Sequence, residues 1–193
     1  ELLDLLGLDL TAKIQIHLGG TYGNRCSALQ RFIRTWQGHP ESVRCRLILE
    51  NDDHSYGVAD CIAVHEQIGI PVVFDVLHHD VLTTKVAVKP GRSRHQGKGW
   101  REALISCLET WRAHDGAPIV DYSEQASGAR LGTHAQRIDE QRFRMFLAQV
   151  RDLRFDLMLE VKDKERSALR AIQILSALSI PQTGGFHRPA SPQ

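Results

Sequence analysis

The sequence lacks several features that would by themselves assign the protein to a class. Its 193 residues include only four cysteines, which lie far apart and form no CxxC pair, so neither a disulfide framework nor a thiolate zinc site is expected. No apolar run approaches the roughly 20 residues of a membrane-spanning helix, and the N-terminus lacks the basic region of a signal peptide. We therefore expect a cytoplasmic protein whose cysteines are reduced and packed in apolar segments.

The chain also lacks an excess of charge of either sign. Its formal net charge is +1, so it is not a polycation, and any contact with nucleic acid must come from a local basic patch. With 42% hydrophobic residues the chain can bury a core, and no low-complexity linker divides it. We expect one domain over residues 1–180, followed by a disordered tail over 181–193.

Short β-rich runs alternate with helical patterns along the whole chain. The runs cover residues 12–17, 44–50, 70–75, 117–121 and 155–160. Apolar residues recur at a spacing of three or four over residues 28–36, 58–68, 100–111, 143–153 and 167–178. This alternation predicts an α/β fold in which helices cover a parallel sheet.

The number of βα units is too small for a closed barrel. A complete (β/α)8 barrel of the TIM type takes about 250 residues, and only five units are visible here. Residues 1–7 (ELLDLLG) look like the end of an amphipathic helix entered midway, and no initiator Met precedes them. We predict an incomplete TIM-barrel-type domain of about five βα units that lacks the N-terminal strands of a longer protein.

Each of the five β-rich runs ends on a residue that is able to bind a metal. These residues are His17, Glu50, Asp75, Asp121 and Glu160. Active sites of parallel barrels form at the C-terminal ends of the strands, so these five side chains should converge on one mouth. Two further candidates, His78 and His134, lie just downstream of strands. Oxygen and imidazole ligands without thiolates suit Zn, Mn or Fe.

A single polar residue at a strand end has an ordinary explanation, because it often caps a helix or faces water in a loop. A run that is built for a dry core, such as residues 70–75 (IPVVFD), would nevertheless incur a cost if its final carboxylate were buried without a partner. The same chemistry at all five strand ends favours a metal site over five separate solvated residues.

Four ordered segments resemble the UV damage endonuclease family. They are residues 17–23 (HLGGTYG), 49–53 (LENDD), 71–79 (PVVFDVLHH) and 155–165 (FDLMLEVKDKE). The resemblance implies a metal-dependent barrel that nicks DNA on the 5′ side of UV photoproducts, namely cyclobutane pyrimidine dimers and 6-4 photoproducts. The ligands that it implies are His17, Glu50, Asp75, His78, His134 and Glu160.

The resemblance also implies the cofactor and the partner. We expect divalent metal ions, roughly two or three per site, with Mn favoured and Zn or Mg as alternatives. The expected partner is damaged double-stranded DNA. We expect a monomer that does not associate with a membrane and that lies in the bacterial cytoplasm, held at the nucleoid through DNA.

Residues 118–123 (PIVDYS) depart from the family pattern Pro-Lys-x-His-(Tyr/Phe)-Ser. Ile119 stands where the family has a lysine close to the metals, and Asp121 stands where it has a ligand histidine. Aspartate can still bind Mn or Zn, so Asp121 is kept as a predicted ligand. Isoleucine cannot act as a lysine does, so the rate or the metal preference should differ.

A basic segment between residues 81 and 101 contains no acidic residue. It carries Lys85, Lys89, Arg92, Arg94, Lys98 and Arg101. Because it follows the strand of Asp75, it should hang over the mouth of the site, where it would neutralise phosphates without reading sequence. The alternative is a solvated basic loop. The residues predicted to contact DNA are Tyr22, Arg25, Lys89, Arg92, Arg94, Tyr122 and Lys162.

Two other functions remain open at this point. A sugar isomerase or epimerase on the same kind of barrel would also gather Glu, Asp and His on metals, although a small sugar needs no basic surface. An inactive DNA-binding remnant would fit Ile119 and the missing strands.

Overall fold

A computed structural model describes residues 1–87 and 99–178. Five strands form one parallel sheet in the order β1-β2-β3-β4-β5: β1 (Ile14–His17), β2 (Leu47–Glu50), β3 (Val72–Asp75), β4 (Ile119–Tyr122) and β5 (Asp156–Leu159). Each strand matches one predicted β-rich run, and the predicted α/β fold is confirmed. In the described part of the chain, no helix has the length and apolar character needed to cross a bilayer. The single domain over residues 1–180 stays a prediction, and the predicted tail lies outside the described residues.

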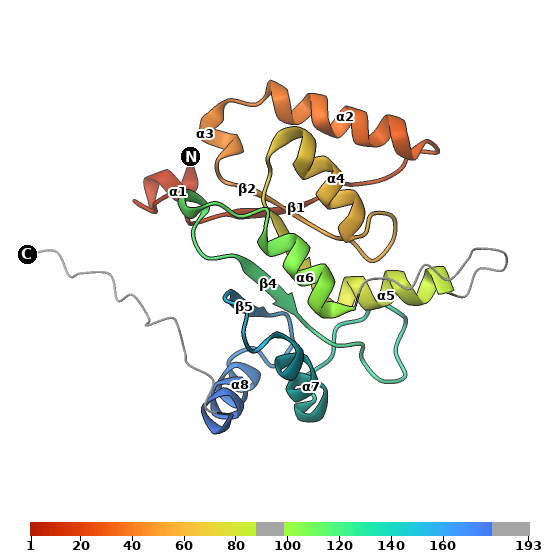
Figure 1. The fold of residues 1–193 in the computed structure, drawn as a ribbon, viewed down its shortest axis with the longest axis vertical. Coiled ribbons are helices and arrows are strands. Elements are labelled where there is room, and N and C mark those ends of the chain that lie inside the picture. Colours follow the sequence, from red (N-terminus) through yellow and green to blue (C-terminus); the bar gives the residue numbers. More distant parts are fainter. Residues whose placement is uncertain (88–98, 179–193) are drawn as a thin grey trace, which may run out of the picture.

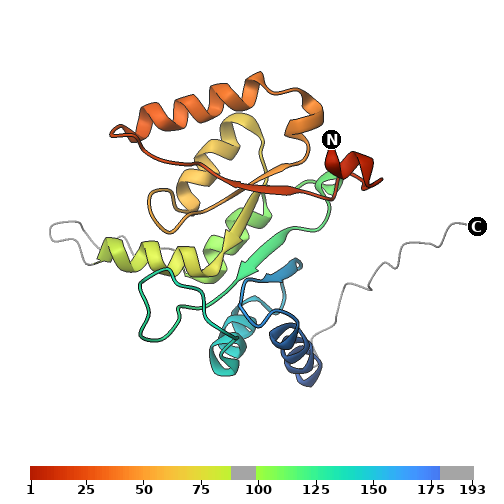
Figure 2. The ribbon, with the colours of Figure 1, turned by 180° about the vertical axis from the view of Figure 1, so that it is seen from behind.

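Helices alternate with the strands along the chain. They are α1 (Leu2–Leu5), α2 (Arg25–Gly38), α3 (Glu41–Arg44), α4 (Val58–Ile68), α5 (Val76–Ala87), α6 (Trp100–Leu108), the 3-10 turn η1 (Ala113–Asp115), α7 (Glu140–Val150) and α8 (Glu165–Ala177). Helix α2 packs on α4, α4 on α6 and α6 on α7. Figures 1 and 2 show these helices along the outside of the strands, with α2 and α4 at one end of the row and α7 and α8 at the other.

The sequence places the starts of α2 and α7 too late, because the first turns of these helices are polar. Helix α2 begins at Arg25, where the Asn24 side chain accepts a hydrogen bond from the Ser27 amide. Asp139 caps α7 in the same way. A polar N-cap satisfies an amide that the helix leaves without a partner, and it carries no apolar period. Helix α6 ends before the predicted Trp111, whose indole instead donates to the Val72 carbonyl at the start of β3.

The basic segment between residues 81 and 101 is not a single loop, and its predicted contact with DNA stays a prediction. Helix α5 follows β3 without a break and contains Lys85, and Arg101 belongs to α6. Lys85 donates to the Asp53 carbonyl at 2.6 Å, and Arg101 forms two 2.7 Å hydrogen bonds with Asp152. The other four basic residues of the segment lie outside the described residues.

Alternate residues of each strand face opposite sides of the sheet. In the described part of the chain, the helices pack on the side that carries the core residues. Phe74, Val120 and Tyr122 belong to the core, and the Tyr122 ring lies 5.0 Å, centroid to centroid, from the rings of Phe143 and Phe146. The predicted metal-binding residues of the same strands alternate with these core residues. They therefore face away from the helices, toward what would be the interior of a barrel.

The sheet of the described residues is open at both edges. Strands β1 and β5 each pair with one neighbour only, and Ile14 and Met158 on these edge strands are 47% and 50% exposed. An open, curved row of five βα units is consistent with the predicted incomplete barrel.

Two of the four cysteines are buried, as predicted. Cys61 and Cys107 lie in the core, whereas Cys26 is exposed in the first turn of α2, so the prediction that all four are packed is wrong. The first turn of a helix faces the solvent on most of its circumference, and Cys26 lies on that side.

Candidate metal centre

The strand register brings the predicted ligands to one end of the sheet. His17 is the register partner of Glu50, and Asp75 is the register partner of Asp121. In a parallel sheet, residues paired in this way lie side by side on neighbouring strands. Glu160 directly follows β5, because the strand ends one residue earlier than the sequence predicted.

The first group of side chains consists of His17, Glu50 and His78. The His17 Nε2 atom lies 3.4 Å from the Glu50 Oε2 atom, and the His78 Nδ1 atom lies 2.9 Å from Glu50 Oε1. One ligand atom from each of the three lies within 4.8 Å of the others. Three ligand atoms at this spacing could hold a metal ion.

Glu50 also belongs to a second group, with Asp75 and Asp121, which meets the same 4.8 Å limit. All three carboxylates are buried, and Asp75 and Asp121 have no exposed surface. The Gln15 side-chain amide donates one hydrogen bond to Glu50 and one to Asp121, both at 2.5 Å. Because Glu50 is common to both groups, the two candidate positions are adjacent.

His134 and Glu160 complete the cluster. The His134 Nδ1 atom lies 2.9 Å from the Glu160 carbonyl oxygen and 3.8 Å from its Oε2 atom, and the His134 ring centroid lies 6.1 Å from that of His78. The structure thus brings all seven predicted residues together, with Glu50 and Glu160 at the same end of the sheet. Their role as ligands remains a proposal.

Burial perturbs the pKa values of the acids of the cluster. Burial raises the pKa of Asp75 to about 7, against the opposing effect of His78. Burial raises the pKa of Asp121 to about 8, and the charges of Glu160, Glu50 and Asp75 add to the increase. Burial lowers the pKa of His78, but the hydrogen bond with Glu50 and the charge of Asp75 outweigh it and raise the pKa to about 9. The cluster therefore holds more buried carboxylates than its positive groups neutralise, which favours a bound cation.

Two carboxylate oxygens show where a cation would fit. Asp75 Oδ2 and Asp121 Oδ1 are buried and have no hydrogen-bond partner among the described residues. Buried polar atoms are nearly always paired, and an orphaned carboxylate oxygen is costly unless it coordinates a metal. Carboxylate and imidazole donors suit Mn, Zn or Mg. The residues therefore fit divalent metal ions.

Two amide side chains that the sequence analysis missed orient the cluster. Gln15 lies two residues before His17, on the same face of β1, so strand alternation could have identified it. Asn51 exchanges two hydrogen bonds with the Asp75 backbone, at 2.9 and 3.1 Å. The His78 Nδ1 atom also lies 3.0 Å from the Asn51 carbonyl oxygen. These two acceptors favour a proton on Nδ1, so Nε2 would be the nitrogen that loses its proton to a metal ion.

Comparisons with known proteins identify the family. The family model described as UV-endonuclease UvdE matches residues 1–184. The chain belongs to this family. A UV DNA damage endonuclease of Clostridium perfringens is 31% identical over 180 residues, which are 93% of this chain and 41% of the relative. A UV DNA damage endonuclease of Bacillus velezensis is 33% identical over 180 residues, which are 92% of this chain and 53% of the relative.

A solved structure of the UvdE family shares the fold. The crystal structure of SacUVDE matches with a TM-score of 0.78 and 39% identity, over 93% of this chain and 56% of that one. The chain thus spans about half the length of the UvdE relatives that it matches.

The residues that were predicted to contact DNA differ in their exposure and in their partners. Tyr122 has no exposed surface, and its hydroxyl donates to Glu124 at 2.6 Å, so assigning it to DNA contact was wrong. It alternates with Asp121 and therefore faces the helices. Tyr22 is 83% exposed, Lys162 is exposed, and Arg25 is paired with Asp60. The predicted contacts Lys89, Arg92 and Arg94 lie outside the described residues.

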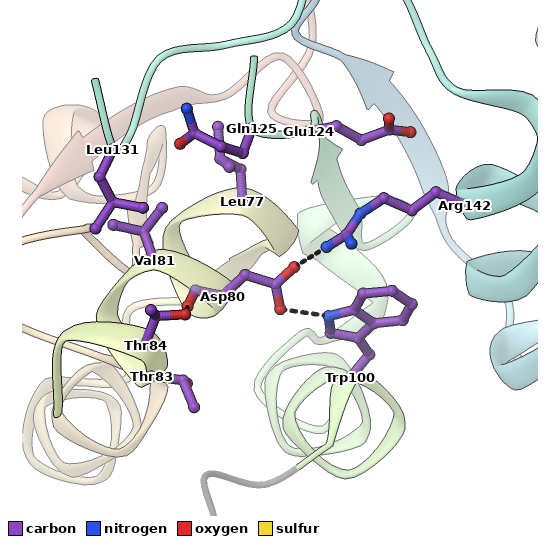
Figure 3. Close-up of a pocket in the computed structure, with 10 residues that line it drawn as sticks. All are labelled: Leu77, Asp80, Val81, Thr83, Thr84, Trp100, Glu124, Gln125, Leu131 and Arg142. Carbon is purple, nitrogen blue, oxygen red and sulfur yellow. Dashed lines mark hydrogen bonds and ion pairs between the residues drawn. The ribbon is translucent and has the colours of Figure 1, made fainter. Parts of the chain in front are cut away.

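A separate cavity of about 540 Å³ lies between α5, the start of α6, the segment after β4, and α7. None of the seven predicted ligands lines it. Figure 3 shows Asp80 between Trp100 and Arg142 in this cavity. The Trp100 indole donates to Asp80 at 2.8 Å, Arg142 pairs with the other carboxylate oxygen, and the guanidinium lies over the Trp100 ring, 5.3 Å from its centroid. Asp80 therefore ties α5 to α6 and α7.

We expect Asp80→Ala to lower the free energy of unfolding by about 1–2 kcal/mol, because it removes two hydrogen bonds to a partly exposed carboxylate. Chemical denaturation of the chain measures this change. Asp152→Ala is the matched control: it also removes a carboxylate bound by an arginine, but at an exposed site, so its midpoint should hardly change. Equal midpoints for the two variants would show that Asp80 does not hold the helices together.

Proposed function

We propose that the chain carries the metal-binding part of a DNA-repair endonuclease that nicks DNA 5′ to UV photoproducts. One observation supports this proposal most strongly: a cluster of buried carboxylates and imidazoles, with unpartnered oxygens on Asp75 and Asp121, lies at the carboxyl end of a UvdE-family sheet. Family membership favours DNA over a sugar as the substrate. Cytoplasmic location at the nucleoid and a monomeric state are parts of the same proposal.

The proposed ligands are His17, Glu50, Asp75, His78, Asp121, His134 and Glu160. Divalent ions bound there, Mn in the first place and roughly two or three in number, would supply an activated water and a Lewis acid for phosphodiester cleavage. Glu50 belongs to both ligand groups and is the best candidate to bridge them. Gln15 holds the carboxylates of Glu50 and Asp121 at a fixed separation.

The chain's own residues prepare the site in two further ways. Asn51 fixes the end of β3 and the Nδ1 side of His78, so neither Asp75 nor His78 needs to reorganise when a metal binds. Exposed Lys162 lies two residues beyond Glu160 and would contact a DNA phosphate.

Nicking of supercoiled plasmid by the full-length protein tests the proposal. We expect UV-irradiated plasmid to be nicked with Mn²⁺ present and to stay intact with EDTA, and undamaged plasmid to stay intact in both. A short duplex with one thymine dimer then locates the cut, which should lie on the 5′ side of the dimer. Metal analysis of the purified protein reports the ions independently of activity.

His39→Ala is the control variant, because His39 is an exposed residue at the far end of α2 from the cluster and should leave nicking unchanged. Bound metal without damage-dependent nicking would contradict the endonuclease. Absence of both metal and nicking would favour the inactive DNA-binding remnant.

A further inference from the structure

Tyr22 projects from the loop between β1 and α2 in an unfavourable backbone conformation. Its φ is 47°, in the left-handed region that disfavours residues other than glycine, and its side chain is 83% exposed. Among the described residues, Lys164 is the only other non-glycine residue with positive φ. An aromatic residue that is both exposed and strained contributes little to the stability of this fold, which points to a role outside it.

The neighbours of Tyr22 hold its ring in a defined orientation. The Arg31 guanidinium of α2 lies over the ring, 5.4 Å from its centroid. Gly20 lies so close to the ring that a Cβ there would be 3.5 Å from it. The ring is therefore supported by a cation and by backbone, while most of its surface faces the solvent.

The position of Tyr22 in the chain places the ring near the metal centre. It follows His17 by five residues, in the loop that leaves the carboxyl end of β1. Arg25 begins α2 three residues later, so the positive end of a 14-residue helix lies beside the loop. A polyanion that reaches the metal centre would pass this loop.

We propose that the Tyr22 ring stacks on a nucleobase that has left the duplex stack when DNA is bound at the metal centre. A supported aromatic ring with a cation behind it binds any base through the π-face and needs no sequence-specific hydrogen bond. A damaged base pair is stacked and paired less firmly than an intact one, so such a platform favours damaged sites. The inference rests on the proposed function in that DNA is taken to lie at this end of the sheet.

Three variants of the full-length protein test the stacking. Tyr22→Asn removes the ring but keeps a residue that tolerates the left-handed conformation, Tyr22→Phe keeps the ring, and His39→Ala is the surface control. The probe is a short duplex with one thymine dimer, and fluorescence anisotropy in EDTA measures its Kd without cleavage. Loss of one stacked base should raise the Kd of Tyr22→Asn about 5-fold to 100-fold. Tyr22→Phe and His39→Ala should stay within about twofold of the wild type.

Two further readouts separate stacking from other roles. The slope of log Kd against log salt should not change in Tyr22→Asn, because no phosphate contact is lost. The melting temperature of Tyr22→Asn should equal or exceed that of the wild type, because the strained residue has been relieved. A structural role would instead lower the melting temperature, and a hydroxyl contact would make Tyr22→Phe as weak as Tyr22→Asn.

The outcomes distinguish this inference from the proposed function. Equal Kd values for wild type and Tyr22→Asn overturn the stacking, whether or not the protein nicks UV-irradiated plasmid. Tyr22-dependent binding of the duplex, or of single-stranded oligothymidine, by a protein that does not nick overturns the endonuclease and leaves the stacking in place. No binding of either DNA by the wild type overturns the stacking, and absence of nicking with Mn²⁺ overturns the endonuclease.

Discussion

Replacing Asp75 with asparagine in the full-length protein should abolish nicking of UV-irradiated DNA. Asp75 is fully buried at the end of β3, and its Oδ2 atom has no hydrogen-bond partner among the described residues. Changes to groups that only orient a metal ligand cost about 10–100-fold in metal affinity or activity, so loss of a ligand itself should cost at least about 100-fold. Plasmid nicking at saturating Mn²⁺ measures the rate, and metal analysis measures the ions bound.

The same substitution should have the opposite effect on the stability of the metal-free protein. Asparagine keeps the oxygen that accepts a hydrogen bond from the His78 amide, and its amide group can donate where Oδ2 now faces Glu50 and Asp121. Asp75 is one of three clustered buried carboxylates, and His78, 3.7 Å from its Oδ2 atom, already pairs with Glu50. Replacing this carboxylate with a neutral amide should therefore raise the free energy of unfolding in EDTA, by about 1 kcal/mol. Added Mn²⁺ should stabilise the wild type by about 2.7 kcal/mol at 100 times its Kd, and should not stabilise Asp75→Asn.

Asp75→Asn should thus be more stable than the wild type in EDTA and less stable in Mn²⁺. A purely structural role of Asp75 would not reverse the order of the two proteins. Asp115→Asn is the matched control: Asp115 is also a buried aspartate, but it is paired with Lys13 at 2.8 Å and belongs to no ligand group. It should lower stability in EDTA and in Mn²⁺ alike. Retained nicking with full metal content in Asp75→Asn would show that Asp75 is not a ligand.

The positions of the strands and of the clustered side chains could be predicted because both depend on a short sequence period. Each strand places alternate residues on opposite faces and ends at the same edge of a parallel sheet, so Glu50, Asp75 and Asp121 could be assigned to one mouth. The same alternation places Tyr122 on the helix side, away from the end of the sheet that DNA would reach. Gln15 was overlooked because an uncharged amide gives no signal of a metal site.

Helix α5 could not be predicted because the residue that starts it belongs to the preceding strand. The Asp75 carboxylate accepts a hydrogen bond from the His78 amide at 2.6 Å. Asp75 is therefore both the last residue of β3 and the cap of the next helix. No Gly, Pro or Ser separates the two elements, and His78 and His79 interrupt the apolar period. This turn explains why the buried strand ends in an acid that is soon followed by an imidazole. Asp75 caps the helix, and the first turn of the helix brings His78 into contact with Glu50.

Replacing Ile119 with lysine in the full-length protein should raise the rate of nicking about tenfold or change the preferred metal. Ile119 lies two residues before Asp121 in β4, on the same face, and it is only half-buried, so a lysine can reach the cluster or the solvent at its mouth. Its charge would offset part of the repulsion among the carboxylates and could contact the phosphate, and tenfold in rate needs only about 1.4 kcal/mol of stabilisation in the transition state. Ile119→Met, of similar reach but without charge, is the control and should leave the rate unchanged. Nicking rates with Mn²⁺, Zn²⁺ and Mg²⁺ compare the three proteins, and identical rates for the lysine and methionine variants with every metal would reduce position 119 to a packing position.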